Sequence, residues 1–220
     1  MNSIPREGYT LHFLPEGNAG TTTHQFGGRN DIAGAWCPNC KKPLLLLLKL
    51  DSTDMRLLLD TCGMPTMPLL FCWTCNVSQS LFSYIVEPPC RITLIEYGEG
   101  GCVTDFPYVN YPAEFPRRSF VLEPVPPDEA AALEHAMKAP GDWLSLPSSL
   151  QTPRHQIGGQ PLLYTDDEHV CPVCAEVMPL LGVIGDDAGT PRGIVGNPYV
   201  QTVFHLCRAC RCVLVYQSCD

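Results

Sequence analysis

The chain has 220 residues, of which 45% are hydrophobic, so it is long enough for one large domain or two small ones with a real core. Its formal net charge of −9, from 14 Lys and Arg against 23 Asp and Glu, argues against binding nucleic acid or an anionic membrane through a broad basic face. A basic or neutral protein partner fits this charge better.

The N-terminal residues lack the apolar segment of a signal peptide, and the longest apolar run, 44–48, is far shorter than the roughly 20 residues of a membrane span. We therefore expect a cytoplasmic protein without a transmembrane segment.

Short apolar segments predict a strand-rich fold, because most contain β-branched or aromatic residues and are bounded by Gly, Pro or polar turns. In chain order the predicted strands are 44–50, 80–86, 91–97, 119–123, 199–206 and 212–217. The leucine-rich segment 44–50 would suit a buried helix equally well, and only its length and context favour a strand. The aromatic and Pro-rich stretch 105–127 is expected to lie as a strap over the sheet.

One helix is predicted at 128–138, where prolines precede the segment and Pro140 and Gly141 follow it. Glu134 is placed to form an ion pair with Lys138 one turn later. The residues expected on its apolar face are Ala130, Leu133 and Met137. Strands with a single helix predict an α+β, strand-dominated fold class.

The sequence also contains an internal repeat. Each copy has, in the same order, an HQxGG tag, a CPxC pair, a Pro-Leu-Leu run and a second CxxC pair. The tags, 24–28 and 155–159, are offset by 131 residues, and the first and second cysteine pairs are offset by 134 and 135. This agreement predicts that a β-rich module was duplicated and fused into one pseudo-symmetric unit. The predicted parts are a first repeat at 20–98, a Pro- and aromatic-rich connection with the helix at 99–154, and a second repeat at 155–220.

The cysteines predict metal binding. A count of 13 is odd, and export is not expected, so a disulfide framework is disfavoured. Two residues between cysteines let one tight turn aim both sulfurs at a single ion, and four cysteines close the tetrahedral shell of a structural zinc. We expect two zinc ions, with the pairs combined either within or across the copies. The expected ligands are Cys37, Cys40, Cys72 and Cys75 in the first copy and Cys171, Cys174, Cys207 and Cys210 in the second.

Two other interpretations of the cysteines stay open at this point. Some could be buried free thiols, and an iron–sulfur cluster also takes four thiolates, although the duplicated pairs favour zinc. The remaining cysteines have no matching pair in the other copy and are expected to fill the core; these are Cys62, Cys90, Cys102, Cys212 and Cys219.

No catalytic residue or organic cofactor is predicted, because the sequence lacks a phosphate-binding loop, a nucleophile elbow and an HExxH motif. The tag histidines, His24 and His155, are expected to serve the fold. An alternative is an enzyme that uses them between the repeats, with aspartates drawn from Asp51, Asp54, Asp166, Asp167, Asp186 and Asp187. A second alternative is a zinc-ribbon nucleic-acid binder, suggested by Arg208 and Arg211 beside a cysteine pair; these residues and Arg117 and Arg118 fit an ordinary solvated surface better.

The tract LLLLLKLDSTD at 44–54, preceded by a GG turn and a CPxC pair, resembles the YwqG-like family and its relatives around programmed cell death protein 2. The second copy is similar through HQIGGQP at 155–161 and GDDAG at 185–189. The resemblance covers most of 20–217. It implies a duplicated strand-rich α+β fold without a catalytic residue. Lys49 departs from the family pattern, which has Gln at this position in many members.

The resemblance also implies a function class. Some eukaryotic relatives act as chaperones for a basic ribosomal protein, and bacterial relatives look like accessory or toxin-immunity proteins. The expected function is therefore a zinc-stabilised, non-enzymatic protein that binds a protein partner, possibly a basic one. Neither nucleic acid nor a membrane is expected as a partner.

Overall fold

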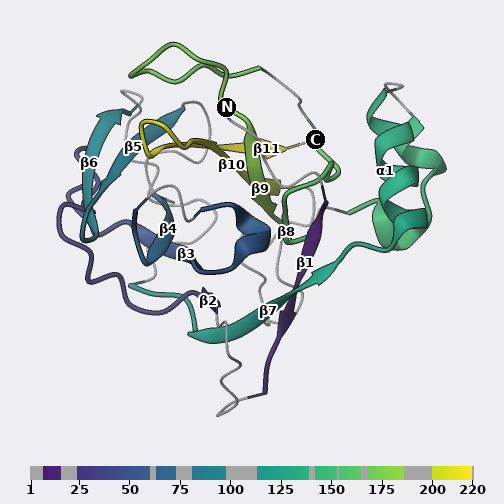
Figure 1. The fold of residues 1–220 in the computed structure, drawn as a ribbon, viewed down its shortest axis with the longest axis horizontal. Coiled ribbons are helices and arrows are strands. Elements are labelled where there is room, and N and C mark those ends of the chain that lie inside the picture. Colours follow the sequence, from purple (N-terminus) through teal and green to yellow (C-terminus); the bar gives the residue numbers. More distant parts are fainter. Residues whose placement is uncertain are drawn as a thin grey trace.

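The computed structural model describes residues 7–15, 24–59, 63–72, 81–97, 113–138, 142–152, 154–164, 168–185 and 200–219. They form one curled sheet of 11 strands in the order β4-β3-β2-β7-β1-β8-β9-β10-β11-β5-β6, with the helix α1 to one side (Figure 1). No helix in these ranges is long and apolar enough to cross a membrane. The strands are β1 (Tyr9–Phe13), β2 (His24–Phe26), β3 (Leu45–Asp51), β4 (Thr66–Phe71), β5 (Phe82–Glu87), β6 (Arg91–Glu96), β7 (Arg118–Pro124), β8 (Gln156–Ile157), β9 (Leu180–Ile184), β10 (Val200–Cys207) and β11 (Cys212–Cys219). The helical elements are α1 (Pro127–Lys138) and the short 3-10 turns η1 (Met55–Leu57), η3 (Asp142–Ser145) and η4 (Ser148–Leu150).

The predicted α+β, strand-dominated class is confirmed. Strands β3, β5, β6, β7, β10 and β11 lie at the six predicted segments, with small differences at their ends. The leucine-rich segment is a strand because β2 and β4 flank it on both sides, and most of its side chains are buried. Buried strands of this kind need not alternate between apolar and polar residues.

Helix α1 begins at Pro127, one residue before the predicted segment, and contains the predicted ion pair between Glu134 Oε1 and Lys138 Nζ at 2.6 Å. Its buried residues are Leu133 and Ala136, so the buried face is turned slightly from the predicted one. These residues pack with Leu146, Leu150 and Leu162 in a small cluster beside the sheet.

The strand order is the same on both sides of the central β7–β1 pair. Moving outward, β2, β3 and β4 follow on one side and β8, β9 and β10 on the other. The tag glutamines have matching registers, since Gln25 pairs with Ser119 and Gln156 pairs with Thr10. Each tag glutamine thus pairs with one strand of the central β7–β1 pair, at a corresponding place in the strand order. The arrangement fits the offsets of the sequence repeat, while duplication and the three-part division of the chain stay predictions.

The order is not symmetric at the outer strands. In the second half, β11 turns back on β10, and Cys212 pairs with Cys207. In the first half, β5 pairs with β11 instead of with β4. The end strand β6 also contacts the segment between β2 and β3, because the backbone N–H of Ile92 donates to Ala33 O at 2.8 Å. The segment before the first CPxC pair therefore lies against the far end of the same sheet.

Candidate metal centres

The second copy brings its four predicted cysteines together. The sulfur atoms of Cys171, Cys174, Cys207 and Cys210 lie within 4.8 Å of one another. Cys171 and Cys174 belong to the turn before β9, whereas Cys207 ends β10 and Cys210 lies in the turn to β11. The distance between the sulfurs of Cys174 and Cys207 is 3.7 Å.

The turn at Cys171 is shaped by its backbone. The N–H of Ala175 donates to Cys171 O at 2.8 Å, and the N–H of Cys171 donates to Glu176 O at 2.8 Å. Ala175 has a positive φ of 60°, which reverses the chain directly after the second cysteine. A short bridge between Val170 and Val177 closes the base of the turn.

The first copy repeats this geometry. The N–H of Lys41 donates to Cys37 O at 3.0 Å, the N–H of Cys37 donates to Lys42 O at 2.9 Å, and Lys41 has a φ of 61°. The sulfurs of Cys37, Cys40 and Cys72 lie within 4.8 Å of one another, with 3.7 Å between those of Cys40 and Cys72. The fourth predicted ligand, Cys75, lies outside the described residues. The described cysteines thus combine within each copy and not across copies.

The sulfur distances fit a metal ion. A Zn–S bond of about 2.3 Å places the sulfurs of a regular tetrahedron about 3.8 Å apart, close to the 3.7 Å seen in both clusters. A disulfide needs about 2.05 Å, so neither of these pairs is bonded. Four thiolates leave no open position for water or substrate, so a metal here would hold the fold together and would not catalyse a reaction.

The electrostatics of the second cluster also suit a cation. Burial raises the pKa of Cys171, but hydrogen bonds from the backbone N–H groups of Cys174 and Val173, together with those from the Cys174 and Cys207 side chains, outweigh burial and lower the pKa. Burial and the neighbouring cysteines raise the pKa of Cys207 and Cys210, because clustered thiolates repel one another. A bound divalent cation would relieve that repulsion.

One further thiol lies beside the second cluster. Cys212 is fully buried on β11, and burial, followed by the nearby charge of Cys171, raises its pKa. Sequence reasoning assigned Cys212 to the core, which it does occupy, but spacing alone did not show its place next to the ligands. Cys90 is half-buried. Cys62, Cys102 and the side chain of Cys219 lie outside the described residues.

The two tag histidines have different surroundings. His24 has no exposed surface, and its Nδ1 accepts the backbone N–H of Asp51 at 2.9 Å. The proton of the neutral ring is therefore on Nε2, which donates to Asp54 Oδ2 at 3.1 Å. His155 is partly buried and packs against the ring of Phe26, with 5.5 Å between centroids.

These contacts bear on the alternative of a His/Asp active site. Asp54 is itself 5% exposed and accepts three side-chain hydrogen bonds from Arg56. His24 and Asp54 are thus held inside the fold, where a substrate would not reach them. Asp51 caps its own turn through Thr53. Asp166, Asp167, Asp186 and Asp187 lie outside the described residues.

The arginines also have specific places. Arg208 Nη2 donates to Leu57 O at 3.0 Å, which ties the second cysteine turn to η1 in the first half. The Arg118 guanidinium lies 3.4 Å from the centroid of the Phe13 ring. Of the predicted aromatic strap, Phe115 and Phe120 are buried, whereas 98–112 lies outside the described residues.

No significant match to this chain is found among protein-family models, curated proteins or solved structures.

Proposed function

We propose that the protein is a non-enzymatic protein-interaction protein of the YwqG-like type, located in the cytoplasm, in which two structural zinc ions hold the cysteine turns in place. The observation that supports this most strongly is the four-sulfur cluster of the second copy, with its closed shell and 3.7 Å sulfur spacing. The first cluster supports the same assignment with three described cysteines, to which Cys75 would add the fourth. Zinc would supply folding energy at both sites.

The cysteine turns also carry exposed apolar side chains that a partner could cover. Trp36 is 56% exposed at the base of the first turn, where it bridges the exposed Pro43. At the same place in the second turn, Val170 is 54% exposed and Val177 49%. Val173, at the tip of that turn, is 50% exposed. Both metal centres therefore hold an apolar pair at the surface, as expected of a rigid interaction site.

The charge of the chain indicates the chemistry of the partner. With a formal net charge of −9, the protein would attract a basic partner and repel acidic ones. A basic segment with apolar side chains would be attracted by the negative net charge of the chain, and its apolar side chains could pack on the apolar pairs of the cysteine turns. An accessory, chaperone-like or immunity-type role is compatible with this chemistry.

The test is to recover the tagged, zinc-loaded protein from cells that naturally make it and to rebuild any stoichiometric complex from purified components. We expect a basic partner whose affinity falls at least tenfold in the double variant Val170→Ser and Val177→Ser. Leu144→Ser serves as the matched control, because Leu144 is 65% exposed and belongs to η3 and not to either cysteine turn. The proposal fails if no complex can be rebuilt, or if the two variants weaken it equally.

A further inference from the structure

A cavity of about 430 Å³ in the first half of the chain is lined by three cationic side chains. Arg29, Lys49 and Arg117 surround it, and Asp31 is the one carboxylate among its lining residues. This is unusual in a chain with a formal net charge of −9. The volume falls within the range of small-molecule sites, roughly 300–1,000 Å³.

The sheet and the first tag place these groups. Lys49 on β3 pairs with Gln25 on β2, and the side-chain Nε2 of Gln25 donates to Gly27 O at 2.8 Å. Gly28 has a φ of 84°, and a Cβ there would lie 2.8 Å from Gln25 Nε2 and 3.3 Å from Arg117 Cβ. The glycine thus allows the amide of Gln25 and the stem of Arg117 to approach the same wall of the cavity.

The charges around the cavity are only partly neutralised. Arg29 Nε pairs with Asp31 Oδ1 at 2.7 Å, and both side chains are largely exposed. Neither Lys49 nor Arg117 has an ion-pair partner among the residues that the structure describes. Lys49 is half-buried, where an ammonium group is costly unless an anion is near. The cavity therefore has a surplus of positive charge.

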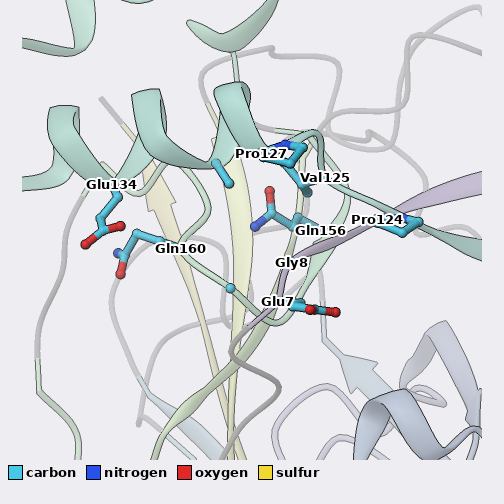
Figure 2. Close-up of a pocket in the computed structure, with 10 residues that line it drawn as sticks. Glu7, Gly8, Pro124, Val125, Pro127, Glu134, Gln156 and Gln160 are labelled. Atoms are coloured by element: carbon cyan, nitrogen blue, oxygen red, sulfur yellow. The ribbon is translucent and has the colours of Figure 1, made fainter.

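A pocket on the other side of the central β7–β1 pair carries no such positive charge. The tag glutamine Gln156 lines a pocket beneath α1 and repeats the bond of Gln25 by donating from Nε2 to Gly158 O at 3.1 Å. Gln160 takes the place of Arg29 there, and Gly8 that of Arg117. Figure 2 shows this pocket, whose charged side chains are the carboxylates of Glu7 and Glu134. The same scaffold thus forms a pocket without cations.

We propose that the cavity between Arg29, Lys49 and Arg117 is a binding site for a small molecule that carries an oxyanion, either a phosphate or a carboxylate group. The guanidinium of Arg117 offers paired donors for such a group, and Lys49 adds a compact charge beside the strand. The free volume beyond the anionic group accommodates the rest of the ligand. The site is separate from the cysteine clusters and from the apolar pairs, so it does not depend on the function proposed above.

The site can be tested with inorganic pyrophosphate and with succinate, which separate the phosphate source from the carboxylate source. Titrations at constant ionic strength, followed by amide chemical shifts of the zinc-loaded chain, should show saturable changes for one of the two probes. The changes should concentrate at the cavity, in residues 25–32, 46–49 and 117. Shifts that do not saturate with either probe, or that spread evenly over the surface, would overturn the proposal.

Variants give the second readout. Lys49→Met and Arg117→Gln should each weaken binding of the active probe at least tenfold, whereas Lys138→Met, which removes the same charge on α1, should leave it unchanged. Lys49→Met should also leave the unfolding free energy unchanged or raise it, because the lysine has no ion pair to lose within the described ranges. Equal weakening in Lys138→Met, or undiminished binding in both cavity variants, would contradict the proposed site.

Discussion

The hydroxyl group of Tyr84 takes the place of a neighbouring strand for Leu70. The backbone N–H of Leu70, on the free edge of β4, donates to Tyr84 Oη at 2.9 Å, and that hydroxyl donates to Pro68 O at 3.0 Å. Tyr84 is fully buried on β5, near the opposite end of the strand order. One side chain therefore provides hydrogen-bond partners for the buried free edge of β4 and ties the two ends of the curled sheet together.

Replacing Tyr84 with Phe tests this closure. The variant would leave the N–H of Leu70 and the carbonyl of Pro68 buried without partners, and each such group costs about 1–3 kcal/mol. We expect the unfolding free energy, measured by denaturant titration with zinc present, to fall by about 2–6 kcal/mol. Tyr97→Phe is the control, because Tyr97 is 43% exposed and surface changes usually stay within about 0.5 kcal/mol. Similar losses in both variants would show that the hydroxyl of Tyr84 has no special role.

The cysteine clusters predict a metal count. Protein purified without added zinc should contain about two zinc ions per chain, measured by elemental analysis. Cys171→Ser or Cys37→Ser should lower the count to about one, because each removes a ligand from a single cluster, and both should lower the melting temperature. Cys90→Ser should keep both ions, since Cys90 belongs to neither cluster. Iron in place of zinc, or disulfides between the predicted ligands, would refute the assignment.

His24 predicts a loss of stability in mild acid. Burial lowers its pKa below the ordinary value of 6.5, although the hydrogen bond to Asp54 acts in the opposite direction. Above pH 6.5 the ring is neutral in both states and carries no penalty. Below pH 6.5 the unfolded chain takes up a proton that the folded chain resists, so the unfolding free energy decreases by up to about 1.4 kcal/mol per pH unit.

The measurement compares wild type with His24→Gln between pH 7 and 5. Metal loss from the cysteine clusters affects both proteins alike, so the difference between the two curves isolates the histidine. Asp54 does not titrate in this range, because burial raises its pKa but the hydrogen bonds from Arg56 and His24 and the charge of Arg56 together lower it below the ordinary value. Parallel curves would mean that His24 is protonated as easily in the folded as in the unfolded state.

The features predicted correctly from the sequence depend on local patterns. The cysteine turns are set by short spacing and a reversal after the second cysteine, so the pairs of neighbouring cysteines follow from the sequence alone. Strand β4 was missed because Pro68 interrupts its apolar run, and the structure tolerates the proline because β4 is an edge strand. Strand β9 was missed because of Gly182, where a Cβ would lie 2.5 Å from Gln156 O.

Other features depend on distant parts of the chain. Strands β2 and β8 are too short to show a pattern. The pairing of β5 with β11 and the bonds of Tyr84 join segments that are far apart in sequence, and no local spacing indicates them. The same holds for the cationic cavity, because Arg117 comes near Lys49 and Arg29 through the pairing of β7 with β2 and of β2 with β3.

Arg208 is another long-range contact and leads to a last prediction. Its guanidinium donates to Leu57 O, which lies 151 residues earlier in the chain, so the arginine beside the second metal cluster braces the first half of the fold. Arg208→Ala should lower the unfolding free energy by about 1–3 kcal/mol, because the partly buried carbonyl loses a charged donor. Arg91→Ala, at an exposed position on β6, is the control.

The same variants separate this structural role from the alternative of nucleic-acid binding. Fluorescence polarisation with single- and double-stranded oligonucleotides at physiological salt should detect no binding by wild type, and none by Arg208→Ala. A nucleic-acid site would instead give wild-type binding that weakens steeply with salt and disappears in the variant. Two results together would contradict the structural role: unchanged stability in Arg208→Ala, and salt-sensitive binding by wild type. They would indicate that Arg208 contacts phosphate instead.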